Sequence, residues 1–267
     1  MSITPHADLI EKIDAIGQGK TAMSLKRLAV LSVMAGAFIA LGGILSVIAG
    51  FGMAGAMESN PAIQRLLSGL TFPVGLFLIV TFGAELFTGN NATLVPGCAR
   101  RRYTPGKMVV HWTLVWLFNF AGALVFTYLF VYLCGLTAAE PYHSAVVGIA
   151  EAKAALPPLT AFLKGIAANW CVCLAVWLCL MVDTLPSKFL ACLIPVGTFV
   201  ALGFEHSIAN MFFIPAGMME GANVDFWGLM HNLIPVTLGN IVGGALLVGA
   251  LFYRLHARSS KYEPVRL

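Results

Sequence analysis

The sequence predicts an all-α integral membrane protein with six transmembrane helices in two inverted three-helix repeats. Three observations predict it: an apolar composition, six long stretches almost free of charge, and motifs that recur halfway along the chain. Of the 267 residues, 59% are hydrophobic and 10% are charged, with a mean hydropathy of +0.86. A soluble domain is about 45–50% apolar and about 25% charged, so this composition excludes an ordinary soluble domain or a disordered chain. The formal net charge of +4 does not indicate a nucleic-acid partner, because the location of charges matters more than their sum.

Each apolar stretch is long enough to cross a bilayer, which takes about 20 residues of helix. The stretches cover residues 28–57, 66–99, 108–139, 165–182, 189–219 and 226–253. The second is interrupted near its middle by Glu85, and the fifth by Glu205 and His206. These interruptions predict that helices two and five are broken.

Lysine and arginine residues gather on one side of the predicted helices. Of the 16 such residues, all except Arg65, Lys153 and Lys164 fall in one alternate set of loops and tails, or in the termini. Cytoplasmic loops carry such an excess, so both termini are expected in the cytoplasm, in agreement with an even number of spans. We expect a multi-pass protein of the inner (plasma) membrane, organised as a cytoplasmic N-terminal segment (1–25), a six-helix domain (26–256) and a cytoplasmic C-terminal tail (257–267).

An internal repeat divides the membrane domain into two halves. The recurring motifs, at offsets of 120 and 121 residues, are Gly83-Ala-Glu with Asn90 and Gly203-Phe-Glu with Asn210, then Asn119-Phe-Ala-Gly and Asn240-Ile-Val-Gly. Three spans per half give the halves opposite orientations, with repeat one at about 26–139 and repeat two at about 155–256. Matching interruptions in two inverted halves point to a site at the bilayer midplane. The alternative is that short glycine and asparagine patterns recur by chance.

Ionisable residues at the two interruptions are the candidate functional groups. Broken backbone is tolerated at membrane depth only where it is buried in protein or lines a wet cavity. Glu85 and Glu205 occupy equivalent places, and each either holds a break together by accepting backbone N–H bonds or tunes the field of a pathway. His206 has no equivalent in the first half, where Leu86 stands. Because a symmetric structural role would not need a histidine on one side only, His206 is expected to face a pathway rather than to be a satisfied core residue.

Other polar residues have weaker signals. Lys153 is either a solvated loop residue or part of an electropositive entrance for anions, and Lys164 is expected to snorkel or pair at the end of its span. His111 and His231 lie near span ends and are expected at the membrane interface. The six cysteines are too few for a disulfide framework and lack metal-ligand spacing, so they are interpreted as small core residues.

Four strings resemble the formate/nitrite transporter family over about residues 20–256. They are GAELFTGN (83–90), KGIAAN (164–169), GFEHSIANMFFIP (203–215) and NLIPVTLGNIVGG (232–244). The resemblance implies an aquaporin-like protomer, a homopentamer in the lipid bilayer, and passage of small monovalent anions: formate, nitrite, hydrosulfide, acetate or lactate. The strings of the second half are more similar to formate channels than to nitrite channels, so formate is the expected substrate. The N-terminal segment carries Ile10, Ile13 and Ile16 at a spacing of three residues, which indicates an amphipathic helix. The resemblance implies that this segment takes part in gating. The alternative is that it lies on the membrane surface.

The resemblance also implies roles for individual residues. His206 resembles the central pore histidine, Thr88 the threonine of the first break, and Lys153 the vestibule lysine. The implied polar network comprises Asn169, Asn210, Asn240 and Glu205; the implied constrictions are Leu86, Phe87 and Val172 on the cytoplasmic side and Phe72, Leu76 and Phe199 on the outer side. The chain departs from the family at Glu85, where members often carry aspartate.

These residues suggest a mechanism and leave two alternatives. An anion attracted by Lys153 would cross the outer collar, be neutralised by proton transfer from His206 or held by a charge-assisted bond to it, and pass the inner collar. An intramembrane enzyme with Glu205 and His206 as acid and base is disfavoured, because neither a nucleophile motif nor clustered metal ligands accompany them. A channel for neutral solutes is the other alternative. We therefore expect a non-enzyme without metal, cofactor or nucleic-acid partner.

Overall fold

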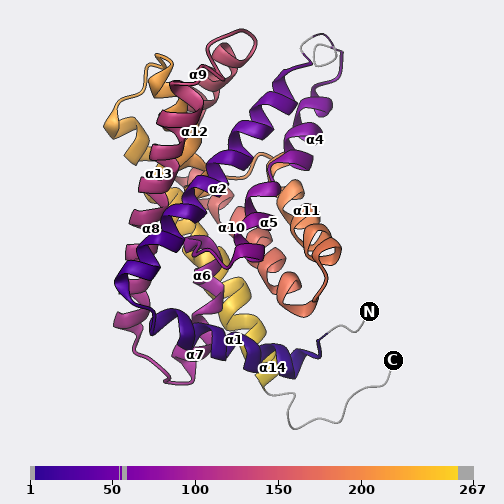
Figure 1. Cartoon of the computed structure of the whole chain (residues 1–267), viewed down its shortest axis with the longest axis vertical. Helices are drawn as coiled ribbons and strands as arrows, with labels where there is room; N and C mark the ends of the chain where they lie inside the picture. The colour runs from indigo at the N-terminus through magenta and orange to yellow at the C-terminus, as the bar shows by residue number, and fades with distance from the viewer. Residues whose placement is uncertain (1–3, 54, 56–58, 258–267) are drawn as a thin grey trace.

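The computed structural model describes residues 4–53, 55 and 59–257, and in those residues every regular element is a helix (Figure 1). The elements are α1 (His6–Thr21), α2 (Leu25–Phe51), α4 (Pro61–Thr71), α5 (Val74–Phe82), α6 (Phe87–Thr93), α7 (Val95–Ala99), α8 (Pro105–Phe126), α9 (Tyr142–Ala154), α10 (Pro158–Met181), α11 (Leu185–Ala201), α12 (Ser207–Met219), α13 (Phe226–Ile241) and α14 (Leu251–Ala257). Two π-helical segments, η1 (Thr127–Tyr132) and η2 (Val242–Ala250), continue α8 and α13. Apart from Ala257, the predicted C-terminal tail lies outside the described residues.

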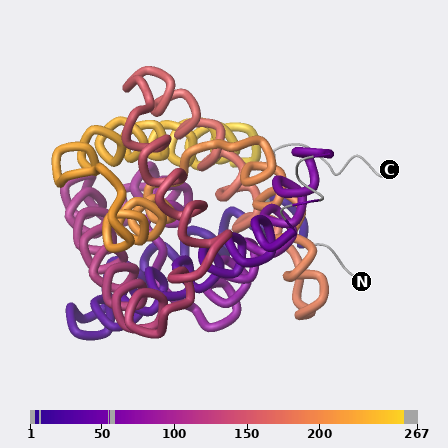
Figure 2. The backbone as a smooth tube through the Cα atoms, turned by 90° about the horizontal axis from the view of Figure 1, so that it is seen from above, coloured from indigo at the N-terminus to yellow at the C-terminus, as the bar shows by residue number. Residues whose placement is uncertain are grey.

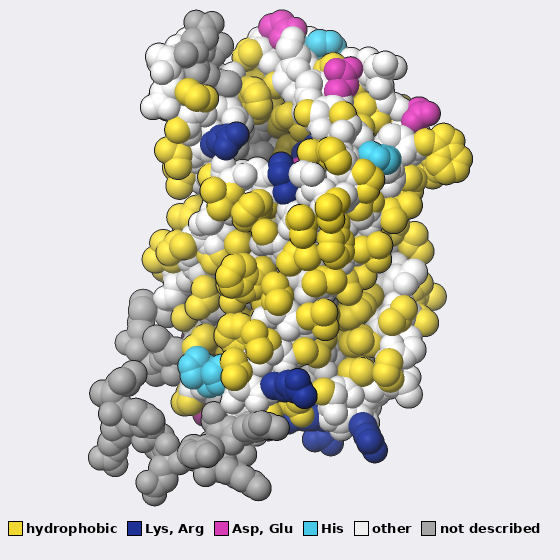
Figure 3. Space-filling view, turned by 180° about the vertical axis from the view of Figure 1, so that it is seen from behind, with side chains coloured by type: hydrophobic (Ala, Val, Ile, Leu, Met, Phe, Trp, Pro, Cys, Tyr) yellow, Lys and Arg dark blue, Asp and Glu magenta, His cyan; other side chains and the backbone are white. Residues whose placement is uncertain are grey.

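Several helices are suited to a membrane. Within the described residues, five are long and apolar enough to span one: Leu25–Phe51, Pro61–Phe82, Pro105–Tyr132, Pro158–Met181 and Phe226–Ala257. The predicted fifth stretch instead forms two shorter apolar helices, α11 and α12, of 17 and 13 residues. Hydrophobic side chains cover the flank of the molecule between two ends where charged residues gather (Figure 3). The chain is therefore a helical membrane protein.

Local sequence signals set where these helices begin. Ser24, Thr104, Thr184 and Asp225 each cap a long helix by accepting a hydrogen bond from a backbone N–H of its first turn. Asn60 does the same for α4, where its Oδ1 accepts from the backbone N–H two residues on at 3.0 Å. These caps satisfy N–H groups that would otherwise be unpaired.

Both predicted interruptions are breaks in the helical backbone. Helix α5 ends at Gly83, which has φ +67°, and α6 begins four residues later. Helix α11 ends just before Gly203, which has φ +70°, and α12 begins at Ser207. Glycine adopts this left-handed conformation without a steric penalty, which is why each break begins at the glycine of the repeated motif.

Close helix pairs surround the breaks. Helix α2 packs against α8, and α10 against α13; seen from above, α2 and α8 lie on one side and α13 with η2 on the opposite side (Figure 2). A Cβ added to Gly122 would overlap the backbone carbonyl of Val33, and one added to Gly243 would overlap that of Ile166. Small residues thus let these backbones approach within the protomer.

Helix α1 lies against the end of the bundle near α7 and α14 (Figure 1). Leu9, Ile10 and Ile13 are fully buried in a cluster with residues of α10 and η2. This helix therefore packs its apolar face on the protein. Arg100 binds the carboxylate of Glu11 at 2.7 Å and holds the pKa of that carboxyl below its ordinary value.

Candidate functional site

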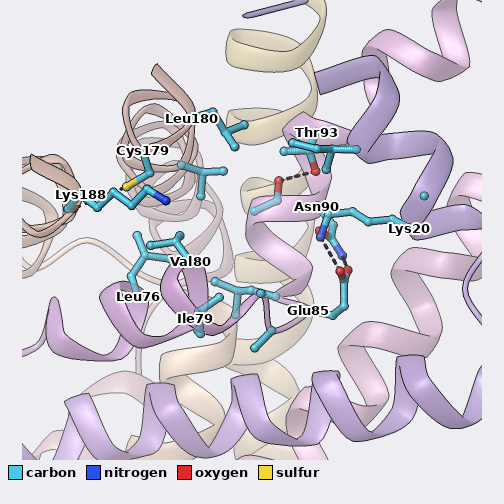
Figure 4. A pocket seen from close by; sticks show the side chains of 17 residues that line it. Lys20, Leu76, Ile79, Val80, Glu85, Asn90, Thr93, Cys179, Leu180 and Lys188 are labelled. Atoms are coloured by element: carbon cyan, nitrogen blue, oxygen red, sulfur yellow. Dashed lines mark hydrogen bonds and ion pairs between the residues drawn. The ribbon is translucent and has the colours of Figure 1, made fainter. Parts of the chain in front are cut away.

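Within the described part of the chain, a cavity enters the bundle from each end. The inner cavity, at the α1 end, has a volume of about 370 Å³ and is lined by residues of α1, α5, the first break, α6, α10 and α11 (Figure 4). The outer cavity, at the end where α4 and α9 lie, has a volume of about 450 Å³. Its wall includes the second break, and Figure 3 shows basic side chains around a hollow at this end. The two breaks therefore face different cavities.

His206 and Thr88 join the two breaks. Both are buried, and the Nε2 of His206 lies 2.9 Å from the Oγ1 of Thr88. The Nδ1 of His206 accepts a hydrogen bond from the backbone N–H of Ala209 at 3.0 Å and thereby caps α12. A nitrogen that accepts from an N–H carries no hydrogen, so the proton is on Nε2 and the ring is neutral in this arrangement. His206 thus donates to Thr88 from a fixed orientation.

Asn119 of α8 holds the first break. Its Oδ1 accepts from the backbone N–H of Phe87 at 2.9 Å, and its Nδ2 donates to the carbonyls of Ser32 at 2.7 Å and Glu85 at 2.9 Å. One buried amide therefore bonds two backbone groups at the break, those of Phe87 and Glu85, and ties them to a carbonyl of α2.

Asn240 does the same for the second break. Its Oδ1 accepts from the backbone N–H of Ser207 at 2.8 Å, and its Nδ2 donates to the carbonyls of Gly165 at 2.8 Å and Glu205 at 3.1 Å. The interpretation that glutamates hold the breaks by accepting backbone N–H bonds is therefore replaced: asparagine amides do so. Sequence analysis noted Asn119 in the repeat but did not include it among the site residues.

The carboxylate of the first break is paired with a lysine. The Oε1 of Glu85 lies 2.6 Å from the Nζ of Lys20 on α1, and its Oε2 accepts from the Nδ2 of Asn90 at 2.8 Å (Figure 4). Sequence analysis did not single out Lys20, which lies in the predicted cytoplasmic segment and far from the repeated motifs. This ion pair ties α1 to the wall of the inner cavity.

The second break carries an equivalent cluster. Glu205 binds the Nζ of Lys153 at 2.9 Å and accepts from the Nδ2 of Asn210 at 2.7 Å. Asn232 of α13 donates to the carbonyl of Lys153 at 2.9 Å and accepts from Asn210 at 2.7 Å. Lys153 is therefore not a solvated loop residue, and its ammonium lies 5.5 Å from the centre of the Phe213 ring. Asn232 was not predicted as part of this network.

Additional cations line both cavities. Arg65 and Lys164 share the wall of the outer cavity with Lys153, so Lys164 faces this cavity and does not merely snorkel at a span end. Lys188 of α11 lines the inner cavity together with Lys20 (Figure 4). Each cavity thus has more lysine and arginine than carboxylate in its wall, which favours anions.

Apolar rings border the outer cavity. Phe72 and Phe199 meet edge to face with their ring centroids 5.9 Å apart, and the Phe199 ring stacks on that of His206 at 5.8 Å. Leu76, expected beside these rings, lines the inner cavity together with Leu86. A solute that passes between the cavities would therefore exchange water for hydrocarbon surface near His206.

Two further expected constriction residues, Phe87 and Val172, are fully buried. Asn169 is buried as well, and its Nδ2 donates to the carbonyl of Asn240 at 2.6 Å and to the Oδ1 of Asn91 at 3.1 Å. Asn169 therefore ties α10 to both halves. Within the described residues, no group of three or more His, Cys, Asp and Glu side chains could hold a metal ion.

Comparisons with known proteins agree with this geometry. The sequence pattern of the formate/nitrite transporter family matches residues 7–254. A protein of Methanothermobacter thermautotrophicus named "Probable formate transporter" is 39% identical, with 94% of this chain and 97% of that protein covered. The formate channel FocA of Escherichia coli K12 is 36% identical, with 87% of each chain covered.

Solved structures show the same fold. An FNT family ion channel has a TM-score of 0.85 at 32% identity, covering 93% of this chain and 98% of that one. A pentameric formate channel with formate bound has a TM-score of 0.77 at 31% identity, covering 87% of this chain and 98% of that one. This chain belongs to the formate/nitrite transporter family, whose members are membrane channels and transporters and not enzymes.

Proposed function

We propose that this protein is a channel for small monovalent weak-acid anions, with formate as its main substrate. The observation that carries the proposal is the buried His206–Thr88 hydrogen bond between two cation-lined cavities. Relatives named as formate channels, and a similar structure described with formate bound, support the choice of formate. Nitrite or hydrosulfide is the alternative cargo within the family.

The proposed architecture has six spans in two inverted halves. The second span is built from α4 to α7 and the fifth from α11 and α12. The matching roles of Asn119 and Asn240, each with one bond accepted and two donated to backbone groups, support the inverted repeat. Both termini would lie in the cytoplasm, with the inner cavity open to that side of the inner membrane.

The proposed assembly is a homopentamer with one pathway in each protomer. The similar structure described as a pentameric formate channel supports it. Large apolar side chains exposed on the flank of the molecule would contact lipid or neighbouring protomers.

Entry of the anion would begin with attraction. Arg65, Lys153 and Lys164 in the wall of the outer cavity outnumber its one carboxylate, Glu205, and this balance raises the local concentration of anions. The anion would then meet Phe72 and Phe199, where an unpaired carboxylate costs several kcal/mol and its neutral acid costs far less.

His206 would assist at this point by hydrogen bonding. Its Nε2–H, which donates to Thr88, can be offered to an oxygen of the anion. Transfer of that proton from the neutral ring would leave an imidazolate, unless Nδ1 first takes a proton and gives up the cap on Ala209. Coupling of flux to protonation would therefore involve either direct entry of the neutral acid or release of the α12 cap.

The test is formate flux through purified protein in liposomes. We expect His206→Phe to abolish or reshape the pH dependence of formate flux between about pH 5 and about pH 8. Thr88→Val serves as the second variant, because it removes the hydrogen-bond partner and keeps the size. Unchanged flux and pH profile in His206→Phe would remove His206 from the mechanism, and equal flux of formate and formamide would indicate a neutral-solute channel.

A further inference from the structure

His111 is a buried histidine that the proposed pathway does not use. It lies on α8 and is 5% exposed, and among the described residues neither ring nitrogen has a hydrogen-bond partner. Its Nε2 lies 3.9 Å from the Oε2 of Glu85. His111 is therefore buried behind the carboxylate that lines the inner cavity. Buried polar groups without a partner are rare and costly, so this one calls for an explanation.

The second half of the chain has an asparagine at the matching place. Asn232 follows His111 by the same offset that separates Asn119 from Asn240. Its amide is fully used, since it donates to the carbonyl of Lys153 and accepts from Asn210. The two lysine–glutamate clusters therefore differ at one position. It is a titratable histidine, His111, at the inner cavity and an asparagine, Asn232, at the outer cavity.

The charged surroundings of His111 are few. Burial opposes the protonated ring most strongly, Glu85 favours it, and Lys20 of α1 and Lys107 of α8 also oppose it. Helices α6 and α12, which also pack against α8, have no ionisable residue, and Lys26 and Arg27 at the start of α2 are exposed. The Oε2 of Glu85, 3.9 Å from Nε2, is within reach of a small movement of the ring.

We propose that His111 is a proton-binding site that sets the charge of the inner cavity. When its ring takes a proton from water, Nε2–H donates to the Oε2 of Glu85, whose negative charge is then shared between His111 and Lys20. The cavity wall gains one positive charge and attracts anions more strongly. The outer cavity, with Asn232 in place of the histidine, lacks this response. The importance of this charge for transport rests on the proposed function, but the proton site itself does not.

The experiment measures the local potential without transport. Gly19 lines the inner cavity, and a Cβ built on it meets no atom within 4 Å, so Gly19→Cys introduces a reporter thiol with room for it. The thiol is treated with a methanethiosulfonate reagent that is either anionic (sulfonatoethyl) or cationic (trimethylammonioethyl). Mass spectrometry of the peptide that contains residue 19 measures the rate of each reaction. Because native Cys179 also lines this cavity, the reporter is placed in a Cys179→Ala background, so that no second thiol can add charge to the wall.

One added charge changes the two rates in opposite directions. We expect the anionic-to-cationic rate ratio to rise about tenfold as pH falls through the histidine range. His111→Asn, which copies the residue of the second half, should abolish the rise, and His111→Gln provides a second variant in case the first does not fold. A ratio that is flat in the parent, or that rises equally in the histidine variants, overturns the proposal. A normal rise in a protein that transports no formate would leave this site intact and refute the proposed function instead.

Discussion

The strongest quantitative prediction concerns Asn240, which holds the second break. Asn240→Ala removes the acceptor for the backbone N–H of Ser207 and the donors to the carbonyls of Gly165 and Glu205. All three bonds are buried. The N–H of Ser207 and the carbonyl of Glu205 belong to the break and would lose this partner, whereas the carbonyl of Gly165 lies inside α10. A buried polar group left without a partner costs about 1–3 kcal/mol, so these two groups predict a loss of about 2–6 kcal/mol.

The assay is thermal unfolding of purified protein in detergent. For a protein of this size, about 1 kcal/mol corresponds to about 2–4 °C, so the midpoint should fall by about 4–24 °C. Asn119→Ala should have a similar effect, because Asn119 makes the same three kinds of bond at the first break. Asn223→Ala is the matched control, since that side chain is exposed. Midpoints within about 2 °C of the parent for both buried asparagines would refute the idea that their amides hold the breaks.

Three further predictions follow from the fold and the cavities. Gly122→Val should destabilise the protein by about 1–3 kcal/mol in the same unfolding assay, because its Cβ overlaps a carbonyl of α2, while Gly148→Val, which has open space, should not. Lys153→Met should lower formate uptake into liposomes severalfold at low salt and less at high salt, because it removes a cation from the outer cavity; equal loss at both would contradict an electrostatic role. The bond from Arg100 lowers the pKa of Glu11, so its stabilising effect is present above the unfolded pKa of about 4.3 and is lost as pH falls through the lower folded value. In Glu11→Gln, the unfolding midpoint should therefore fall less steeply at acid pH than it does in the parent. An unchanged dependence of the midpoint on pH would contradict the pairing of Glu11 with Arg100.

Several features could be predicted because they depend on neighbouring residues alone. The apolar stretches follow from hydropathy, and the breaks follow from Gly83 and Gly203, whose left-handed conformation ends each helix. The repeated motif contains Asn240, a predicted site residue, and also Asn119, the equivalent residue in the first half, which was not predicted as one.

Other features depended on contacts between distant segments. Lys20 meets Glu85 across 65 residues of sequence, and only the docking of α1 brings them together. His111 belongs to a predicted apolar stretch, yet its burial behind Glu85 depends on how α8 is rotated.

The sequence by itself determined the membrane class, the two helix breaks and the residues of the central histidine motif. Only the tertiary structure decided which amides hold the breaks, which lysine neutralises each glutamate, and which nitrogen of His206 carries the proton. The physical reason is that hydropathy and glycine conformation act along the chain, whereas buried hydrogen bonds depend on the depth and rotation of helices packed side by side.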